Sequence, residues 1–594
     1  MKLKDLLSPF HVWKRAAQKP WTIKKPIDER PGADNYRGFH QNDFSKCIGC
    51  GTCEDICQNE AIDLLPVEGQ ETKHGDSGLR PSIDYGRCCW CALCIDICPT
   101  GSLTMSNEYN WVDADAEVFR FTPGKDHKEW NSSTKGYKSS TEFQILDYDR
   151  INMPELTAEQ RKKSFVEMIK GYSREQAIKE AERCLECGLC VSRCPAHMDI
   201  PEYIKAIRLN NIEQALQILY KTNPFSASCG RICTHRCEEV CALTHQGDPI
   251  AIRWLKRYIL DQVPAAQMPQ ILADKIQTNN KTIAIVGAGP GGLTTAYYLR
   301  LLGYEVTIFE SKEKGGGMLR YGIPEYRLPY NQLDKDIDYI IALGVKIKYN
   351  QKIGKDVPFK ELYGAFDAVY LSTGLEEAYS LRCEGEDLPG VVAGVDFLRD
   401  VTRGKRPDIG KEVVVIGGGN VAMDVARTCV RFGAKVTILY RRRIVDMPAD
   451  VEEISEAQEE KVNFNPQSLQ TKIEKTPAGR LKLHWNNMKM VDDPGKDRPK
   501  PIPIEGDTDS MVIDTVFSAI GQKADFQFLP IELEKELKFK WGKIVTDEKG
   551  QTSLAKVFAG GDASNWVADA VSAIADGHQA AVGIDNYLRK KMEE

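Results

Sequence analysis

The sequence predicts a multidomain protein in which two cysteine-rich modules precede a long α/β region. Sixteen of its 19 cysteines fall into four tight groups before residue 242. After residue 280, short β-branched strands alternate with helical stretches, and two of these strands run into glycine-rich turns. This pattern is typical of parallel α/β sheets. Because 594 residues exceed what one hydrophobic core can serve, we expect several domains.

Composition excludes some classes of function. A net charge of -6 does not suit nucleic-acid binding, which requires a basic face. No apolar run approaches the ~18 residues of a membrane span, and the N-terminus lacks the features of a secretory signal. Since thiol-rich chains without export signals are typical of a reducing compartment, we expect a cytoplasmic protein. Residues 1–35 are interpreted as a polar, basic arm that is either solvated or docks on an acidic partner or on membrane headgroups.

The first cysteine module, residues 36–108, contains the spacing Cys-x2-Cys-x2-Cys-x3-Cys twice. In this spacing three thiolates surround one 4Fe-4S cluster while the fourth reaches the other cluster. The spacing predicts two sets of ligands, Cys47, Cys50, Cys53 and Cys98 for one cluster and Cys88, Cys91, Cys94 and Cys57 for the other. Zinc knuckles are the alternative, which two equal quartets disfavour. The surplus Cys89 is expected to be a buried small side chain or a neighbour that tunes a cluster.

This module resembles bacterial two-cluster ferredoxins. Its approach, YRGFHQNDFSKCIGC, is similar to the ferredoxin-type subunit of respiratory complex I. The resemblance implies an α+β ferredoxin domain. Residues 109–155 lack sustained periodicity and are rich in Ser, Lys, Asp and Gly, so we interpret them as a surface linker.

Residues 156–270 are predicted to be mostly helical. Thr157 with Gln160, and Ser173 with Gln176, match the capping box that begins a helix. The cysteine segments that follow are RCLECGLCVSRCPAHMDIP and SCGRICTHRCEEVC, and then comes PIAIRWLKRYI. They resemble the N-terminal domain of the glutamate synthase small subunit and of dihydropyrimidine dehydrogenase, in which a helical domain holds two 4Fe-4S clusters. Zinc remains an alternative for this module.

The resemblance implies ligands for two further clusters. The first set is Cys184, Cys187, Cys190 and Cys241, and the second is Cys194, Cys233 and Cys237 with a fourth ligand that is not cysteine. Here the chain departs from the family, because the Gln or Glu ligand position aligns with Lys256. A protonated lysine offers no lone pair to iron. Cys229, or a ligand from elsewhere, is therefore expected to replace it.

The first strand–glycine–helix unit, residues 282–310, predicts a dinucleotide-binding fold. Gly287 permits the tight turn, Gly289 lets backbone amides approach a pyrophosphate, and Gly292 lets helix and strand pack closely. Glu310 stands where a carboxylate can bind ribose hydroxyls. Because the glycines are framed by two strands and a closing acid, the signal is specific.

The second strand–glycine–helix unit, VVVIGGGNVAMDVART, differs from the first in the residues that follow its second strand. Gly417 and Gly419 repeat the glycine positions, Asn420, Val421 and Asp424 follow, and Arg441 and Arg442 stand where an acid would bind ribose. Guanidinium groups in place of the carboxylate favour a 2'-phosphate, so NADP(H) is preferred over NAD(H). The alternative is an arginine run that is only a solvated edge.

A downstream segment decides which nucleotide binds where. VFAGGDASNWVADAVSAIADG, with Gly561 and Asp562, is similar to flavoproteins of the glutathione-reductase type. The resemblance implies an FAD domain of residues 280–394 and 511–594, with an NAD(P)H domain of residues 395–510 inserted in it, both Rossmann-like. Motifs shared with the glutamate synthase small subunit add further cofactor-binding candidates, namely Gly317, Leu319, Gly322, Ile323, Pro324, Thr373 and Gly374. Asn565, Trp566 and Val567 depart from that pattern.

These parts predict a redox function. Disulfide reductase chemistry is excluded because it needs a CxxC near the flavin, and after residue 241 only the isolated Cys383 and Cys429 remain, which we expect to pack in cores. FAD converts hydride into single electrons, so we expect electron transfer between NAD(P)H and ferredoxin or a ferredoxin-dependent partner, such as a 2-oxoacid:ferredoxin oxidoreductase, within a hetero-oligomer. The alternatives are a glutamate synthase small subunit and a passive electron-transfer or assembly subunit. No acid–base residue is expected, since positioning supplies the catalysis.

Overall fold

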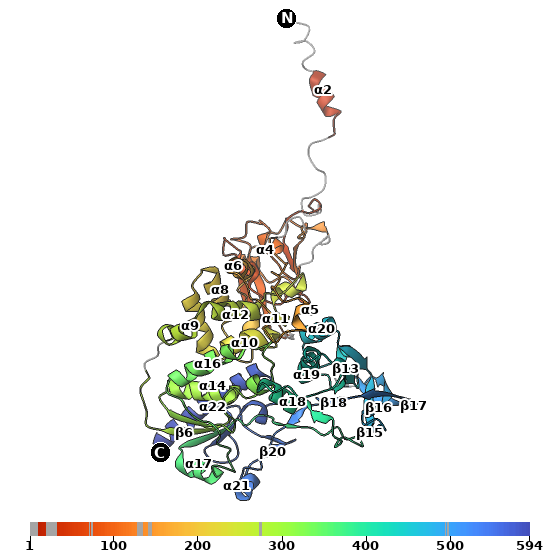
Figure 1. The fold of residues 1–594 in the computed structure, drawn as a ribbon. Coiled ribbons are helices and arrows are strands. Elements are labelled where there is room, and N and C mark those ends of the chain that lie inside the picture. The colour runs from red at the N-terminus through yellow and green to blue at the C-terminus, as the bar shows by residue number, and fades with distance from the viewer. Residues whose placement is uncertain are drawn as a thin grey trace. The chain divides into compact units, whose positions relative to one another are not determined.

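The computed structural model describes residues 10–19, 32–69, 72, 75–126, 135–140, 145–272, 276–493, 495 and 498–593. The chain divides into two compact units, and Figure 1 shows their helices and strands coloured by residue number. The first contains residues 1–149, 187–189 and 239–249, and the second contains the remainder. Most of the predicted N-terminal arm lies outside the described residues, and its described part includes the short helix α2 (Phe10–Ala16). Within the described ranges, no helix is long and apolar enough to cross a membrane.

The first unit repeats one small motif. Each Cys-x2-Cys-x2-Cys loop enters a single helical turn, α3 (Thr52–Asp55) or α4 (Leu93–Asp96). Both turns start at a residue with positive φ, Gly51 or Ala92. The strands are antiparallel, in the order β2-β3-β5 and β1-β4. Their bounds are β1 (His40–Asn42), β2 (Ile62–Pro66), β3 (Leu79–Asp84), β4 (Leu103–Met105) and β5 (Arg120–Phe121).

The predicted linker is partly wrong. Residues 116–119 form a 3-10 turn and β5 pairs with β3 through Ile83 and Phe121. Phe121 is buried in the core of this unit, and Trp111 and Phe119 pack against that core. The segment was interpreted as a linker because its composition is mostly polar, but it also contains these three aromatic side chains. Their burial outweighs the entropic cost of ordering the chain.

The helices of residues 156–270 confirm the predicted helical module. Both capping boxes are present, at Thr157 with Gln160 and at Ser173 with Gln176. The helices are α5 (Ala158–Arg161), α6 (Arg174–Glu182), α7 (Leu189–Arg193), α8 (Ile200–Arg208), α9 (Ile212–Thr222), α10 (Ser226–Ile232), α11 (Arg236–Glu239), α12 (Ile252–Gln262) and α13 (Met268–Ile271).

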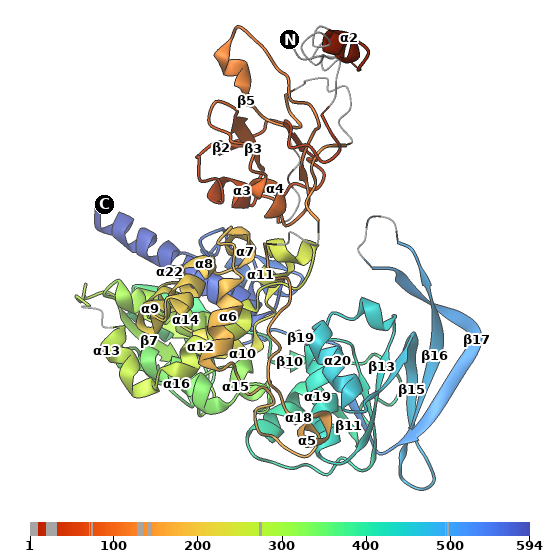
Figure 2. The same cartoon turned by 90° about the horizontal axis from the view of Figure 1, so that it is seen from above.

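The second unit contains two five-stranded parallel sheets (Figure 2). The first has the order β22-β9-β6-β7-β8, with strands β6 (Thr282–Val286), β7 (Glu305–Phe309), β8 (Lys346–Lys348), β9 (Ala368–Leu371) and β22 (Val557–Ala559). Its helices are α14 (Pro290–Leu301), α15 (Met318–Tyr321), α16 (Tyr330–Ala342), α17 (Phe359–Ala365), α21 (Ile531–Glu536) and α22 (Ala570–Glu593). Because β22 pairs with β9, the sheet is completed by the C-terminal part of the chain, as the prediction of a split domain requires.

The second parallel sheet belongs to the inserted domain and has the order β11-β18-β12-β13-β14. Its strands are β11 (Val391–Ala393), β12 (Glu412–Ile416), β13 (Lys435–Tyr440), β14 (Asn463–Pro466) and β18 (Thr515–Ser518), and its helices are α18 (Gly394–Thr402), α19 (Asn420–Arg431) and α20 (Val451–Glu459). An antiparallel sheet of β15 (Ser468–Lys475), β16 (Leu481–Val491) and β17 (Lys500–Ile513) follows.

The predicted boundaries of the inserted domain, residues 395 and 510, need correction. β11 precedes residue 395 and β18 follows residue 510, yet both are strands of the inserted domain's sheet. A short buried strand has the same hydrophobic pattern in either parallel sheet. The sequences of β11 and β18 therefore could not show to which sheet these strands belong. β10 (Glu377–Ala378) and β19 (Gln522–Lys523), which lie in the two segments that connect the parallel-sheet domains, form an antiparallel pair.

A buried carboxylate joins the helical module to the first parallel sheet's domain. Asp336 of α16 accepts hydrogen bonds from the backbone N–H groups of Ala227 (3.1 Å) and Ser228 (2.8 Å), from the Ser228 hydroxyl (2.8 Å) and from the Tyr220 hydroxyl (2.6 Å). These groups lie in the last turn of α9 or at the start of α10. Asp336 thereby satisfies amides that helix α10 leaves without internal partners.

Buried ion pairs hold the inserted domain. The Arg427 and Glu460 side chains are fully buried and form an ion pair at 2.8 Å. Arg427 also binds Glu453 at 2.7 Å, and Arg431 binds Glu460 at 2.7 Å. Arg161, from the helical module, contacts the same acidic group. Buried charged groups, Arg161 of the helical module and Glu460 of the inserted domain, thus connect the two parts of this unit.

We predict that Arg427→Met strongly destabilises this unit. Removing one partner of a buried ion pair leaves uncompensated carboxylates, which costs about 3–5 kcal/mol. The denaturation midpoint of the unit, followed by far-ultraviolet circular dichroism, measures the effect.

Lys435→Met is the matched control. The Lys435–Glu412 pair is 3.7 Å apart and mostly exposed, so its loss should cost at most about 1 kcal/mol. Equal midpoints for the two variants would contradict the role given to Arg427.

Candidate functional site

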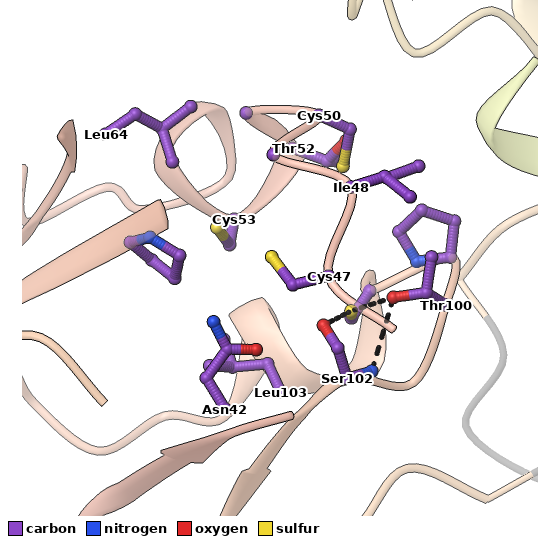
Figure 3. A pocket seen from close by; sticks show the side chains of 15 residues that line it. Asn42, Cys47, Ile48, Cys50, Thr52, Cys53, Leu64, Thr100, Ser102 and Leu103 are labelled. Atoms are coloured by element: carbon purple, nitrogen blue, oxygen red, sulfur yellow. Dashed lines mark hydrogen bonds between the residues drawn. The ribbon is translucent and has the colours of Figure 1, made fainter. Parts of the chain in front are cut away.

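Four thiols of the ferredoxin-type module surround one cavity. A hollow of about 20 Å³ is lined by Cys47, Cys50, Cys53 and Cys98, and Figure 3 shows the first three around it. Burial, and more weakly the charges of Cys98 and Cys47, raises the pKa of the Cys50 thiol. Iron binds the thiolate form, and its positive charge would offset both the burial of these thiolates and their mutual repulsion. The donor set therefore fits the predicted 4Fe-4S cluster.

Hydroxyl groups support this first set. The Cys98 sulfur lies 3.5 Å from the Ser102 hydroxyl and 3.6 Å from the Thr100 hydroxyl. Burial disfavours its thiolate, but hydrogen bonds from these hydroxyls and from neighbouring backbone amides lower the pKa of Cys98 overall. Such donors around ligand sulfurs are a means of tuning a cluster.

The other set also lies together. Burial raises the pKa of the Cys94 thiol, and the charges of Cys88, Cys91 and Cys57 raise it further. The Cys94 sulfur lies 3.4 Å from Nε2 of the buried His40. Burial lowers the pKa of that imidazole to about 3, so His40 is neutral at pH 7.

Cys89 is exposed, so the expectation of a buried side chain is wrong. Its thiol forms a hydrogen bond with Cys91 that contributes to raising the pKa of Cys91. Of the two expectations for Cys89, the neighbour of a ligand is the one that the structure supports. Cys429 is fully buried in the core of the inserted domain, and Cys383 packs at the edge of another core, as predicted.

In the helical module, three thiols share their surroundings with one ammonium group. Burial raises the pKa of Cys237 far above its usual value, and the charges of Cys233 and Cys194 raise it further while Lys256 opposes them. Cys194 and Cys237 are buried, and Cys233 follows α10 directly. The three thiols fit a cluster with three cysteine ligands.

Cys229 lies one helical turn before Cys233 and is fully buried. The charges of Cys233 and Lys256 both act on its thiol. Its ligation of iron stays a prediction. So does the set of Cys184, Cys187, Cys190 and Cys241, because Cys187 and Cys241 belong to the first unit and the other two to the second.

The second unit contains a cavity of about 780 Å³ over the first parallel sheet. The glycine turn after β6 forms one wall. Gly287 has φ +102°, and a Cβ there would lie 2.4 Å from the carbonyl oxygen of Ser372, so only glycine fits this turn. At Gly289, by contrast, a Cβ would have its nearest neighbour at 4.0 Å, the Cα of Gly317, so the backbone at the start of α14 leaves room for a pyrophosphate.

Buried polar atoms without partners point to a ligand in this cavity. Oδ1 of Asp562 and Oγ1 of Thr373 are buried and have no hydrogen-bond partner, and both residues line the cavity. Burial raises the pKa of Asp562 to about 6. Glu310, another wall residue, accepts hydrogen bonds from the backbone N–H groups of Ala288 (2.7 Å) and Lys312 (2.8 Å), which hold its carboxylate in place. These groups fit the hydroxyl-rich chain and the ribose of FAD.

Most predicted cofactor-binding residues line this one cavity. They are Gly287, Gly289, Glu310, Gly317, Leu319, Gly322, Ile323, Thr373, Gly374, Asn420, Val421, Asp424, Gly561 and Asp562. Six predicted residues do not line it, namely Gly292, Pro324, Gly417, Gly419, Arg441 and Arg442. The cavity therefore reaches from the flavin-type turn to the start of α19 in the inserted domain.

Some residues of this site escaped the sequence analysis. Arg327 binds Asp424 at 2.7 Å between the two domains. Ile232 and Thr234, which flank Cys233, line the cavity, as does Asp569. Thr234 and Arg236 both bind the Asp569 carboxylate. The proximity of a cluster ligand to the cavity depends on helix packing, for which the sequence contains no local signal.

The three arginines after β13 differ in their partners. Arg443 forms two bonds with Asp446, at 2.8 and 2.9 Å. Arg442 donates from Nε to the Pro499 carbonyl, and burial together with the charges of Arg442 and Arg498 lowers the pKa of Arg441. Arg441, Arg442 and Arg498 thus form a cluster of cations, of which Arg498 was not predicted. A phosphate group is the ligand that such a cluster suits.

Comparison with known proteins agrees with these sites. Residues 281–577 match the pyridine nucleotide-disulphide oxidoreductase family, residues 161–268 match dihydropyrimidine dehydrogenase domain II with its 4Fe-4S cluster, and residues 46–102 match the 4Fe-4S dicluster domain. The chain is 39% identical to the NADPH-Fe(3+) oxidoreductase subunit beta of Geobacter sulfurreducens, over 68% of this chain and 64% of that one. It is equally similar to the NADP(+)-dependent formate dehydrogenase subunit beta of Moorella thermoacetica, over 68% of this chain and 60% of that one.

A third relative is matched along almost its whole length. The glutamate synthase [NADPH] small chain of Escherichia coli is 33% identical, over 76% of this chain and 99% of that one. FAD, 4Fe-4S clusters and NADP(H) are the cofactors of the matched domains. The chain therefore belongs to the pyridine nucleotide-disulphide oxidoreductase family, as a relative of glutamate synthase small chains that is fused to an N-terminal ferredoxin-like domain.

Proposed function

We propose that this chain is the flavin subunit of a larger redox complex, in which it transfers electrons between NADP(H) and ferredoxin or a ferredoxin-dependent partner enzyme. A 2-oxoacid:ferredoxin oxidoreductase is a partner of the right chemistry. The observation that carries the proposal is the shared cavity, whose wall combines the flavin-type glycine turn with Ile232 and Thr234, the neighbours of Cys233. A cluster held by Cys233 would lie next to the flavin.

The residues around the cavity have positioning roles. FAD supplies the conversion of a two-electron hydride into single electrons. Asp562 and Glu310 would hold the flavin nucleotide through its hydroxyl groups, while the start of α19 at Asn420 and Val421 faces the cavity from the nucleotide side. Hydride transfer needs alignment and exclusion of water rather than an acid or base.

Hydrogen bonds to Asp569 support a path for single electrons from the flavin to a cluster. Asp569 lies in the cavity wall and accepts hydrogen bonds from Thr234 (3.4 Å) and Arg236 (3.0 Å). These bonds fix the loop between Cys233 and Cys237 against the flavin side. We assign the cluster of Cys194, Cys233 and Cys237 as the first acceptor, with the remaining clusters leading to the ferredoxin-type module.

The ferredoxin-type module favours ferredoxin over glutamate synthesis. The match with the glutamate synthase small chain leaves about a quarter of this chain uncovered, and residues 46–102 match a dicluster domain. Such a module offers one-electron carriers at a fixed place in the chain, which suits a partner that itself exchanges single electrons.

The acceptor decides between the three candidate functions. With NADPH under anaerobic conditions, the purified holoprotein should reduce both an artificial dye and a two-cluster ferredoxin, and reduced ferredoxin should in turn reduce NADP+. Dye reduction without ferredoxin reduction, together with glutamate formation from glutamine and 2-oxoglutarate by the co-purified complex, would establish the glutamate synthase alternative. No dye reduction with FAD bound would establish a passive subunit.

The coenzyme preference rests on the cations after β13. Arg443 is held by Asp446, whereas no carboxylate pairs with Arg441 or Arg442 in the described part of the chain. A 2'-phosphate would give those two guanidinium groups a partner, and the glycine turn at Gly417 (φ +149°) brings the start of α19 to the pyrophosphate.

We predict that Arg441→Ala weakens NADPH binding about tenfold or more, because a hydrogen bond to a charged group contributes about 1.5–3 kcal/mol. NADH, which lacks the phosphate, should bind as before. The apparent Kd for each coenzyme, from the rate of flavin reduction in rapid mixing, measures both effects. Arg443→Ala is the matched control and should change neither Kd, whereas an equal loss for NADPH and NADH in Arg441→Ala would refute the assignment.

A further inference from the structure

One stretch of the chain far from the ferredoxin-type sequence packs on the ferredoxin-type module. Residues 239–249 follow the cysteine segments of the helical region, yet they belong to the first compact unit together with residues 1–149. The stretch contains Cys241, which is a predicted ligand of a flavin-side cluster. A 3-10 turn, η5 (Ala242–His245), starts directly after this cysteine.

Gln246 binds the wall of the first thiol cavity. Its side-chain Nε2 donates hydrogen bonds to the carbonyl oxygens of Cys98 (3.3 Å) and Pro99 (2.8 Å). One amide group has two N–H donors, so it can make both bonds at once. Cys98 and Pro99 both line the cavity. We call its four thiols the Cys98 set, namely Cys47, Cys50, Cys53 and Cys98.

Val240 makes a second contact with the same module, on the other side of Cys241. A Cβ on Gly75 would lie 3.1 Å from the Cβ of Val240. Gly75 lies in the connection between β2 and β3, from which the Ser77 hydroxyl donates a hydrogen bond to the Gly49 carbonyl oxygen (2.7 Å). Gly49 also lines the cavity. The chain is therefore held near this wall both before and after Cys241.

Backbone contacts fix the end of the stretch. The N–H of Asp248 donates to the carbonyl oxygen of Tyr148 at 3.0 Å. At Gly247, a Cβ would lie 2.5 Å from the Cβ of Tyr148, so a larger residue does not fit without movement. Truncation of the Gln246 side chain should therefore remove its two hydrogen bonds while these neighbouring contacts remain.

The second group of thiols in this module has a different environment. We call it the Cys94 set, namely Cys57, Cys88, Cys91 and Cys94. Cys91 is exposed, as is the neighbouring Cys89, whereas all four thiols of the Cys98 set are half-buried. An external one-electron carrier can thus approach the Cys94 set at Cys91.

We propose that the ferredoxin-type module exchanges electrons with the flavin side at the Cys98 set and with the external partner at the Cys94 set, and that Gln246 is the positioning residue for the first exchange. The inference rests on the proposed function, since it assumes a cluster at each set and at Cys241. Each hydride from NADPH supplies two electrons. They would cross this contact one at a time, with no bond formed or broken.

The physical reason is the width of the gap. Single-electron transfer slows steeply as the distance between two centres grows. The hydrogen bonds of Gln246 hold the chain of one predicted ligand, Cys241, to the backbone of another, Cys98. They therefore bridge the two cluster-binding segments directly, where a solvent gap would otherwise separate them.

The test follows the two sets separately in the full-length holoprotein. Rapid mixing with NADPH, freezing and EPR give the order of their reduction. Cys47→Ala removes a ligand of the Cys98 set, and Cys88→Ala removes one of the Cys94 set, so each variant assigns one signal. In Cys47→Ala, dithionite should still reduce the Cys94 set, while NADPH should leave it oxidised on this timescale. In Cys88→Ala, the Cys98 set should be reduced by NADPH at the wild-type rate.

Gln246→Ala tests the contact without touching a ligand. Reduction of both sets should slow severalfold, while flavin reduction by NADPH stays as in the wild type. Midpoint potentials and EPR line shapes should also stay unchanged, which distinguishes a wider gap from a damaged cluster. Gln217→Ala is the matched control, because Gln217 Nε2 donates to the Ile271 carbonyl oxygen (3.1 Å) in the second unit. It should change none of these quantities.

The outcomes are separable. Reduction of the Cys94 set by NADPH at the wild-type rate in Cys47→Ala overturns the proposal. If that variant loses the iron of both sets, Gln246→Ala decides alone, and an unchanged rate of cluster reduction in it overturns the proposal. In both cases the wild-type protein still reduces both sets. A wild-type protein whose flavin is reduced by NADPH while neither set is reduced refutes the proposed function, and this inference with it.

Discussion

The carboxylate of Asp336 is the contact on which the arrangement of redox centres depends. It belongs to α16 of the flavin-type domain, yet its hydrogen bonds are made to the start of α10, which bears Cys229 and leads into Cys233. Burial raises the pKa of Asp336 to about 6, and four donors keep it in place. Hydrogen bonds to a charged group contribute about 1.5–3 kcal/mol each. This contact keeps α10, which carries a predicted cluster ligand, on the domain whose cavity we propose binds flavin.

The close approach matters because single-electron transfer depends on where the centres lie. From the end of α10 the chain passes Cys233 and Thr234, and Thr234 reaches Asp569 in the cavity wall. The inserted domain is held from the opposite direction by Arg427 and Glu460. Under the proposed function, nucleotide, flavin and first cluster would therefore be positioned by buried charges at domain contacts, which weaken less with salt than surface pairs do.

The local elements of this architecture could be predicted from the sequence. The capping boxes at Thr157 and Ser173 and the glycine turn at Gly287 each have a short-range signal, a hydrogen-bond pattern or a steric need that glycine alone meets. The split of the first parallel sheet was implied by the resemblance to flavoproteins. The cysteine spacing of the first module predicted which thiols would line one cavity. These are cases in which residue type and spacing determine local geometry.

Long-range contacts could not be predicted. Phe121 joins the core of the first unit from a segment with polar composition, and β18 belongs to the inserted domain's sheet although either sheet could take it. Gly230 of α10 packs closely against Arg257 of α12, and Arg498 approaches Arg441 from a distant connection. In each case tertiary packing brings together residues whose local sequence does not indicate the contact.

The central claim is that electrons leave the flavin through the cluster of Cys233. Rapid mixing of Cys233→Ser with NADPH, followed by flavin absorbance and by EPR of frozen samples, tests it most directly. Flavin should be reduced at the wild-type rate, while the clusters of the ferredoxin-type module, with their iron retained, should stay oxidised on that timescale. Reduction of those clusters at the wild-type rate would contradict the account.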